Sequence, residues 1–361
     1  MRENIIIIAF FIIATQLTGQ SGIYHIPSNK KLPKNYLSKT DVKVKGIQRD
    51  TAILQATLIS DFRQLRRKKS TSEYQKAQLI YAINDTIEVR HQLKLKARGE
   101  SRRKLCTNPP ILLNFKKSDF PNTQFYGLDK VKMVVKCNNN KAFTDYLLRE
   151  FLAYRIYNLI TDKSFKVKLL DITYIDSGKK QDTAQSYAFL IEEADHLAKR
   201  LQAAEIKSEG YSQSPVNPEN ADLHAIFQYL IGNTDWALGN RHNVKIFRQV
   251  PTNGKPTTII VPYDFDFSGL CGTNYSTPRE GLNISNVRSR YYLGLCREPE
   301  ELDQRLQVFR DKKEEIYELV NNFEYLSFED RASIIKYFDK FYETINSPKA
   351  IKRSILSQCK P

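Results

Sequence analysis

Apolar and polar residues alternate along much of the first half of the chain. The alternation is clear over 74–83 and 87–97, and it is partial over 51–60. A strand that buries one face has this period of two. Asn84 and Asp85 predict a turn between the two clearest segments. This part of the chain is therefore predicted to be rich in β structure.

Further short strands and one long helix are predicted to follow. The expected strands are 111–115, 131–135, 167–175 and 186–191, and the expected helix runs from about 141 to 160. The last two strands flank a polar segment that contains Ser and Gly, which favour a turn. We expect a mainly antiparallel sheet accompanied by one long helix.

The second half of the chain has a helical pattern. One set of apolar residues shares a single helix face: Leu223, Ile226, Phe227, Leu230 and Ile231. Their spacing of i, i+3, i+4, i+7 and i+8 is typical of a helix with one buried side. Two more helical stripes run over 302–323 and 334–345, whereas 207–220 is predicted to be a loop because it is rich in Ser and Pro.

The N-terminus has the pattern of a secretory signal peptide. Ten apolar residues at 5–14 follow Arg2 and precede small Gly19. The run is too short to span a bilayer, and its basic start and small residue before the cut are typical of a signal peptide. We predict a signal peptide at 1–19, an N-terminal extension at 20–48 and a secreted or periplasmic location, without a transmembrane helix after cleavage. An N-terminal membrane anchor is the less favoured alternative.

The composition indicates a folded, basic protein. Its 361 residues include 56 Lys and Arg against 40 Asp and Glu, a net charge of +16, and 41% of them are hydrophobic, enough for a substantial core. Basic runs at 63–69 and 98–104 raise the possibility of nucleic-acid binding, but no RNA-binding, zinc-finger or homeodomain signature accompanies them. A basic surface equally attracts phosphate groups or anionic envelope polymers, so nucleic acid is disfavoured.

Chemically informative residues concentrate in 232–270. Asp235 follows the predicted helix, Asn243 closes the next loop, and Asp264 and Asp266 end the second of two strands. This is the layout of a phosphoryl-transfer site, where an Asp orients a hydroxyl and later oxygen ligands hold divalent ions such as Mg²⁺. The alternative is that these residues are ordinary turn and cap residues. It is weaker for Asp264 and Asp266, which would repel each other without a cation or donor between them.

Two Asn residues could supply the metal ligand. Asn240 stands five residues after Asp235, which is the spacing of the protein-kinase catalytic loop, and Asn243 stands eight after it. We favour Asn243 because a strand begins directly after it, as in the kinase arrangement. His242 is expected to orient the loop by a hydrogen bond, and Trp236 is expected to pack beneath it.

Five motifs follow one another between about residue 90 and residue 275: 98–101 (RGES), 149–153 (REFLA), 189–195 (FLIEEAD), 233–243 with its Asn-Thr-Asp and His-Asn, and 262–266 (PYDFD). In this order they resemble the motifs of the spore-coat-protein-H type (CotH-type) secretory kinases. The resemblance implies an α+β, atypical protein-kinase-like bilobal fold. Its antiparallel β-rich N-lobe with one long helix would cover 49–193 and its helical C-lobe 194–361.

The resemblance also implies ATP and Mg²⁺ as cofactors and a hydroxyl on an exported protein as acceptor. Asp235 would be the base, Asn243 and Asp264 metal ligands, and Asp266 a further carboxylate at the metal site. Nucleotide contacts would come from Arg98, Gly99, Ser101, Lys132 and Glu150.

The chain departs from the family at the phosphate-binding Lys. Thr107 to Pro110 stand where the family has a Pro-Lys-Lys run. Lys132 is a possible substitute, or a solvated residue at a strand edge. Glu150 interrupts an apolar helix face, so it either pairs with the nucleotide-binding Lys or reaches water. The main alternative function is accordingly a catalytically degenerate module that binds an envelope partner; a hydrolase is disfavoured because no GxSxG motif is present.

The five cysteines are predicted to form two disulfides, since disulfides persist outside the cytoplasm. Cys106 follows a Gly turn and Cys137 ends the strand expected beside it, so these two are paired. Cys271 and Cys296 flank the segment after the acidic turn and form the second pair, which leaves Cys359 free. The five cysteines are far apart in the sequence and none belongs to a CxxC pair, so a structural zinc site is disfavoured.

Overall fold

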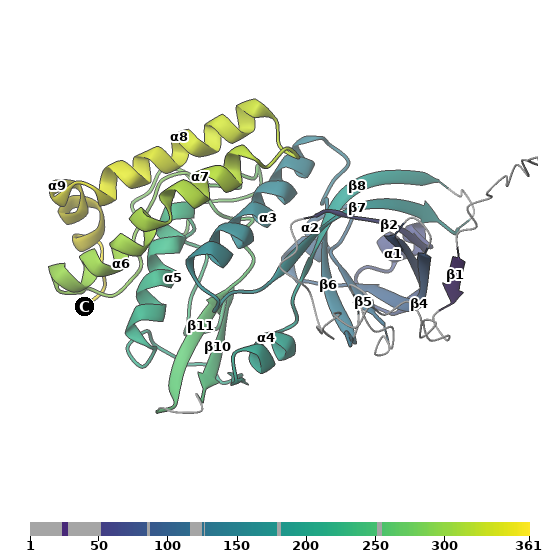
Figure 1. Cartoon of the computed structure of the whole chain (residues 1–361), viewed down its shortest axis with the longest axis horizontal. Coiled ribbons are helices and arrows are strands. Elements are labelled where there is room, and N and C mark those ends of the chain that lie inside the picture. Colours follow the sequence, from purple (N-terminus) through teal and green to yellow (C-terminus); the bar gives the residue numbers. More distant parts are fainter. Residues whose placement is uncertain are drawn as a thin grey trace, which may run out of the picture.

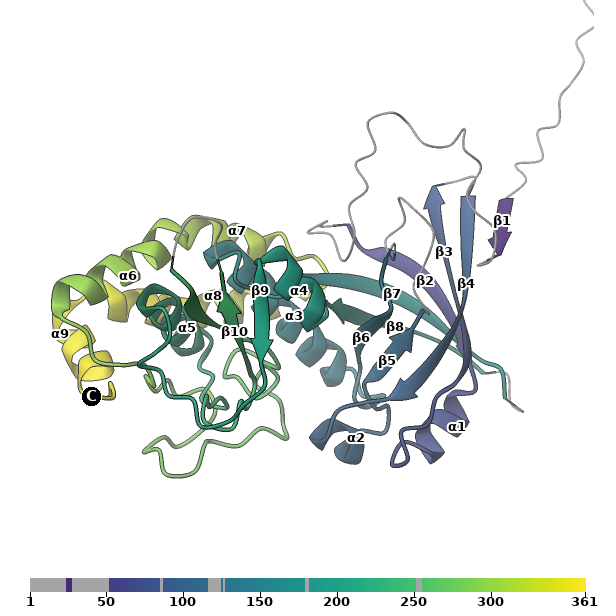
Figure 2. The ribbon, with the colours of Figure 1, turned by 90° about the horizontal axis from the view of Figure 1, so that it is seen from below.

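The computed structural model describes residues 52–84, 87–115, 125, 127–178, 182–250 and 255–361, together with the backbone of strand β1 (Tyr24–Pro27). The predicted signal peptide lies outside the described residues, and so does the predicted extension apart from β1. The described chain contains a β-rich part followed by a mainly helical part, which lie side by side in two perpendicular views (Figures 1 and 2).

Seven strands form a closed barrel. They are β2 (Leu54–Ser60), β3 (Gln75–Asn84), β4 (Ile87–Ala97), β5 (Ile111–Asn114), β6 (Lys130–Val135), β7 (Val167–Asp176) and β8 (Thr183–Ile191). Their order is β4-β3-β2-β7-β8-β6-β5, and pairing of β4 with β5 closes the ring. β2 and β7 are parallel, so the barrel is mixed, and β1 pairs with β4 in parallel. The strands predicted from alternation are confirmed.

The predicted α+β, protein-kinase-like bilobal fold is wrong. An antiparallel sheet in a kinase-like N-lobe would be open, whereas here the long strand β4, of 11 residues, pairs with both β3 and β5 and leaves no gap in the ring. A separate three-stranded sheet adds β9 (Ala203–Ile206), β10 (Val244–Gln249) and β11 (Thr257–Pro262). Alternation fixes which face of a strand is buried but not which strands pair, so the sequence could not reveal the closure.

Nine α-helices are described, of which the first two lie beside the barrel and the others belong to the helical part (Figures 1 and 2). The helices are α1 (Phe62–Arg67), α2 (Ser101–Leu105), α3 (Ala142–Ile160), α4 (Ala194–Arg200), α5 (Pro218–Ile231), α6 (Pro299–Asp311), α7 (Lys313–Asn321), α8 (Phe328–Ile345) and α9 (Pro348–Ile351), with a π-helical turn at Lys352–Leu356. The stripe over 302–323 is thus two helices, α6 and α7. The loop expected to reach residue 220 ends earlier, because the Asn217 side chain caps α5 and Pro218 occupies its first turn.

Helix α3 connects the barrel to the later helices. It is buried nearly all round: Leu148, Leu152, Ala153 and Ile156 have no exposed surface. It contacts β7 and β8 on one side and α5 and α7 on the other, so these elements share one hydrophobic core. A second core fills the barrel, and a third lies beside the small sheet. The division predicted at residue 193 stays a prediction.

Two disulfides are present, and one was paired correctly. Cys106 is bonded to Cys137 as predicted. The predicted bond between Cys271 and Cys296 is wrong: Cys296 bonds Cys359, and Cys271 is a buried free thiol. The reason is tertiary, since the last residues of the chain run beside Leu295 and Cys296, where the Cys296 N–H donates to the Lys360 carbonyl at 2.7 Å.

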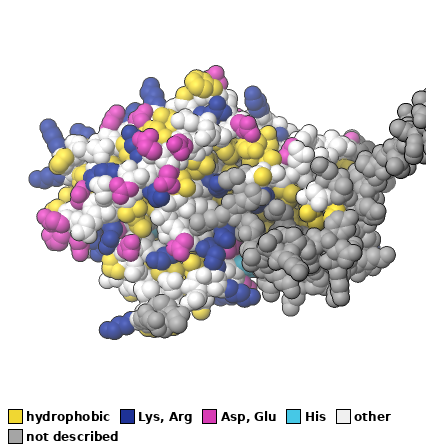
Figure 3. All heavy atoms as spheres, viewed as in Figure 1, with side chains coloured by type: hydrophobic (Ala, Val, Ile, Leu, Met, Phe, Trp, Pro, Cys, Tyr) yellow, Lys and Arg dark blue, Asp and Glu magenta, His cyan; other side chains and the backbone are white. Residues whose placement is uncertain are grey.

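The disulfides fit an exported protein. Among the described helices, none combines the length and the apolar character needed to cross a bilayer. On the described face shown in Figure 3, Lys and Arg side chains are interspersed with acidic ones.

Candidate functional site

A pocket of about 450 Å³ lies between the barrel and the helical part. All of the residues predicted to carry function line it: Arg98, Gly99, Ser101, Lys132, Glu150, Asp235, Asn243, Asp264 and Asp266. They come from β4, α2, β6, α3 and the loops around β10 and β11. A second cavity, of about 390 Å³, lies near α1 and β8 and contains none of them. The structure therefore brings the whole predicted set to one place.

The loop that carries Asp235 is fixed to the end of α5. Gly232 ends the helix in the left-handed conformation, with a φ of 64°. Next to it, the Asn233 side chain donates to Gln228 Oε1 at 2.9 Å and accepts from the Asp235 N–H at 2.9 Å. Asn233 is 1% exposed, so this buried amide locks the start of the loop to the helix.

Two neighbours orient the Asp235 carboxylate. His242 Nε2 lies 2.8 Å from Oδ1 and, because a carboxylate only accepts, donates to it. Asn243 Nδ2 donates to Oδ2 at 2.9 Å and to the Asp235 carbonyl at 2.9 Å. The expected orienting hydrogen bond of His242 is confirmed. Of the two candidate Asn residues, Asn243 lines the pocket, whereas Asn240 is exposed and accepts from the His242 N–H at 3.3 Å.

Asp264 stands at the turn after β11 in a left-handed conformation, with a φ of 64°. Its N–H donates to the buried hydroxyl of Tyr154 at 2.8 Å. Within the described part of the chain, no hydrogen bond or ion pair engages its half-buried carboxylate. The backbone at Asp264 is thus fixed, while its carboxylate can still accept a ligand.

Asp266 is buried, and Tyr275 donates a hydrogen bond to its Oδ2 at 3.0 Å. Burial raises the pKa of Asp266 well above its usual range, the nearby negative charge of Asp264 raises it further, and Arg102 opposes both effects. A cation added between Asp264 and Asp266 would relieve this repulsion. The expectation that the two carboxylates need a cation or donor near them is met in part by Arg102.

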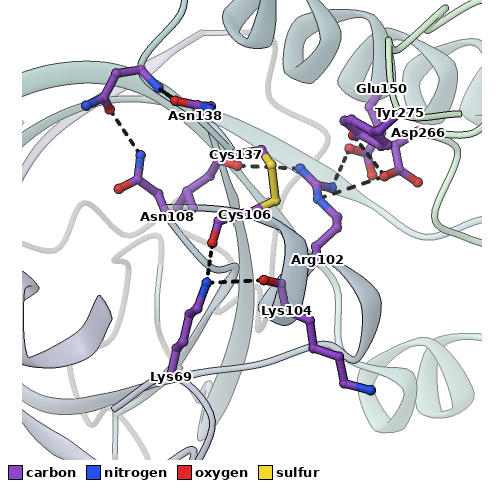
Figure 4. Close-up of a disulfide and its surroundings, with 12 residues drawn as sticks. Lys69, Arg102, Lys104, Cys106, Asn108, Cys137, Asn138, Glu150, Asp266 and Tyr275 are labelled. Atoms are coloured by element: carbon purple, nitrogen blue, oxygen red, sulfur yellow. Dashed lines mark hydrogen bonds and ion pairs between the residues drawn. A yellow bond between two sulfur atoms is a disulfide. The ribbon is translucent and has the colours of Figure 1, made fainter. Parts of the chain in front are cut away.

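Glu150 is buried on α3 and pairs with Arg102 rather than with a lysine or water. Arg102 Nη1 lies 3.0 Å from Glu150 Oε2, and Arg102 Nε lies 3.9 Å from Asp266 Oδ2 (Figure 4). Burial raises the pKa of Glu150, and the positive charge of Arg102 works in the opposite direction. Lys132, the predicted substitute for the nucleotide-binding Lys, instead lies 3.8 Å from Glu193.

Cationic side chains line the pocket as well as carboxylates. Arg98 at the end of β4, Lys132 on β6 and Lys245 on β10 all line it, and Lys245 pairs with Glu205 at 2.7 Å. Burial lowers the pKa of Lys132, and the charges of Arg98 and Lys245 lower it further, against the attraction of Glu193. Lys132 and Lys245 are each paired with a glutamate, whereas no ion pair within the described part of the chain engages Arg98, so Arg98 is the best placed of the three to attract an anion.

Tyr275 and Lys245 are functional candidates that the sequence did not indicate. Arg102 was one of three arginines, with Arg98 and Arg103, for which the sequence left open a phosphate contact or a solvated position, and its pairing with Glu150 and Asp266 was not predicted. Arg102 belongs to a basic run in which its neighbour Arg103 remains near the surface, so composition gives no way to tell them apart. Lys245 stands on the polar face of a strand, where a lysine is ordinarily solvated. Only the position of Arg102 four residues before a disulfide cysteine was an available signal.

The residues present fit a magnesium ion that is completed by a ligand. Among the described residues, no group of three or more His, Cys, Asp or Glu side chains could hold a metal by itself. Magnesium is usually held by one or two carboxylates, with waters and substrate phosphates as its other ligands. Asp264 and Asp266 could supply the carboxylates, and the side-chain oxygen of Asn243 could supply a further ligand. The feature that fits such an ion best is the Asp264 carboxylate, which is unpaired among the described residues and lies next to Asp266. The raised pKa is that of Asp266.

No protein-family model matches the sequence, and a search of curated proteins finds no match. The resemblance to the CotH-type kinases therefore rests on the motifs alone. Each motif contributes at least one residue to the same pocket, but the closed barrel differs from the fold that the resemblance implies.

Proposed function

We propose that the protein transfers a phosphoryl group from Mg²⁺-ATP to a hydroxyl group of an exported protein. The observation that carries the proposal is the mixed charge of the pocket lining, in which four cationic side chains, Arg98, Arg102, Lys132 and Lys245, share one cavity with five acidic side chains from distant parts of the chain. A polyphosphate with its divalent ion needs both kinds of charge at once. The motifs shared with CotH-type kinases support the same activity, and the two disulfides support an exported acceptor.

The cationic side chains would hold the phosphates. Arg98, Lys132 and Lys245 supply positive charge, and Gly99 lies between the first of these and α2 with a φ of 80°. A side chain at Gly99 would be strained in that conformation, and its absence leaves the backbone N–H groups of the turn open to close approach. Asn243, Asp264 and Asp266 would hold Mg²⁺, which when bound neutralises charge on the phosphate oxygens.

Asp235 would accept the proton of the acceptor hydroxyl. Its side chain is 35% exposed, so an incoming hydroxyl can reach it. His242 and Asn243 each donate to one of its oxygens and so fix the plane of the carboxylate. A base held within hydrogen-bonding reach of its proton contributes about 10²–10⁴-fold to the rate.

Two isosteric substitutions separate binding from transfer. Asp264→Asn should lower the affinity for Mg²⁺-ATP at least tenfold, because ligand charge is lost while Asn still tolerates the left-handed backbone. Asp235→Asn should leave that affinity within about twofold and lower transfer by about 10²-fold, since its carboxylate meets the hydroxyl. Calorimetric titration with ATP, with and without Mg²⁺, and a phosphate-transfer assay measure both effects. A wild-type protein that binds no nucleotide with any divalent ion would refute the proposal.

One observation favours a second candidate, a catalytically degenerate module that binds an envelope partner. Arg102 already places a positive charge beside Glu150 and Asp266, so it neutralises part of the negative charge of these two carboxylates without a metal. In that case the pocket would bind an anionic partner through Arg98, Lys132 and Lys245. Binding of an anionic polymer without any nucleotide affinity in the same titrations would favour it.

A further inference from the structure

Helix α2 cannot hold its own position. It has five residues, none of them buried, and no side chain caps its N-terminus. A single helical turn is unstable in water unless tertiary contacts fix it. Nevertheless α2 contributes Ser101 and Arg102 to the pocket, so contacts at its ends must place it.

A disulfide anchors the end of α2. Cys106 follows the helix directly and is bonded to Cys137, two residues beyond the end of β6 (Figure 4). Two hydrogen bonds reinforce the same junction: Lys69 Nζ donates to the Cys106 carbonyl at 2.8 Å, and the Asn108 N–H donates to the Cys137 carbonyl at 3.0 Å. The helix is thereby tied to a strand of the barrel.

Arg102 reaches from this anchored helix across the pocket. Its side chain is 12% exposed, and it pairs with Glu150, whose side chain is 2% exposed. Its Nη2 also lies 3.5 Å from the carbonyl of Val135, two residues before Cys137. Arg102 therefore links the disulfide-bonded segment of β6 to α3 and to the carboxylate of Asp266.

We propose that Arg102 is a positioning residue for two buried carboxylates of the pocket, Glu150 and Asp266, and that the Cys106–Cys137 disulfide holds α2 where Arg102 can act. The inference rests on the proposed phosphoryl transfer. Removing a partner from buried carboxylates leaves them uncompensated, so Glu150 and Asp266 would turn apart. Small misplacements of a group at a reaction site reduce the rate strongly.

The first test compares two substitutions of Arg102. Arg102→Gln should lower kcat at least tenfold while changing the KM for Mg²⁺-ATP less than threefold, because Glu150 and Asp266 are misplaced while Arg98, Lys132 and Lys245 are unchanged. Arg102→Lys should restore part of kcat, since it keeps the charge but lacks the planar fork. Thermal unfolding checks that both variants fold. Wild-type kcat in Arg102→Gln, or no recovery in a folded Arg102→Lys, would overturn the proposal.

The second test asks whether the disulfide acts through Arg102. The double variant Cys106→Ser/Cys137→Ser should lower kcat, and adding it to Arg102→Gln should lower kcat no further, because coupled changes are not additive. The matched control is Cys296→Ser/Cys359→Ser, which removes the other disulfide and should keep the wild-type kcat. Full additivity, or an equal loss of kcat in the control, would show that the disulfide does not act through Arg102.

A third measurement does not depend on nucleotide. Hydrogen exchange of backbone amides in 98–106 and 262–268 should be faster in Arg102→Gln and in the Cys106–Cys137 variant than in the wild type. If the wild type transfers no phosphate, the proposed function fails, while faster exchange in both segments still supports the positioning role. Unchanged exchange in 262–268 would overturn that role, whatever the activity.

Discussion

Asn243 and Asp264 share an uncommon backbone conformation at the edge of the pocket. Their φ values are 52° and 64°, in the left-handed region that non-glycine residues seldom adopt. Asn and Asp tolerate this region best, and strain of this kind concentrates at functional sites. The structure holds both turns together, because the Tyr263 N–H donates to the Asn243 carbonyl at 3.0 Å. Three other described non-glycine residues, Ser72, Gln202 and Arg241, also have a positive φ, so the backbone conformation supports the two site residues without singling them out.

Asn243 and Asn240, the two candidate metal ligands, allow a matched pair of substitutions. Asn243→Gly keeps the positive φ without strain and removes the side chain, so it should lower phosphate transfer at least tenfold through loss of the amide at Asp235 and at the metal site. Asn240→Gly should leave transfer within about twofold, since Asn240 is exposed and lies outside the pocket lining. The reverse result in the same transfer assay would identify Asn240 as the ligand.

At the scale of elements, the end of α5 decides where the catalytic loop begins. Gly232 has a φ of 64°, and a Cβ at this position would lie 2.1 Å from the Tyr337 hydroxyl oxygen. Tyr337 is buried and its hydroxyl donates to the Arg288 carbonyl at 3.1 Å, so the ring has little freedom to move away. The turn toward Asp235 therefore requires glycine for two reasons, conformation and space.

Two alanine substitutions separate these reasons. Gly210 also has a positive φ, of 84°, but a Cβ there would contact nothing within 4 Å. Gly210→Ala should lower the free energy of unfolding by about 1 kcal/mol through backbone strain alone. Gly232→Ala should lower it by about 3 kcal/mol or more, because strain and overpacking add. Denaturant unfolding measures both, and equal losses would show that Tyr337 yields without cost.

At the scale of the whole molecule, each of two hydrophobic regions contains a buried histidine. His91 lies in the barrel beside Tyr81, whose hydroxyl is 3.2 Å from its Nε2. His224 lies on α5 against Trp236, with ring centroids 4.4 Å apart. Burial lowers the pKa of His91 to about 4 and that of His224 to about 3. Both are neutral in the folded protein near neutral pH.

These histidines make stability depend on pH in a defined direction. Their folded pKa values lie below the unfolded value of 6.5, so between these values the unfolded chain binds more protons. The stabilisation is complete above about pH 6.5 and is lost as the pH falls toward 4, by up to about 3 kcal/mol for His91. His91→Gln and His224→Gln should each reduce the slope of unfolding free energy against pH. Denaturant unfolding from pH 7 to pH 4.5 measures it, and unchanged slopes would contradict the assignment.

Much of the local structure was predictable because it depends on short-range patterns. Alternation located β3 and β4, and helical spacing located α3 and α5. The Cys106–Cys137 bond was also predictable, since the two cysteines follow segments that are close in sequence. Pairing of Cys296 with Cys359 was not, because the return of the C-terminus to residue 295 is a long-range event.

The sequence by itself determined which segments are strands and helices, which of their faces are buried, and which polar residues were candidates for a site. Only the tertiary structure decided that β4 pairs with β5 to close a barrel, that Arg102 rather than Lys132 meets Glu150, and that Lys245 joins the pocket. The physical reason is the range of the interactions. Periodicity and turn chemistry act over a few residues, whereas strand pairing and buried ion pairs are selected by the packing of segments that are distant along the chain.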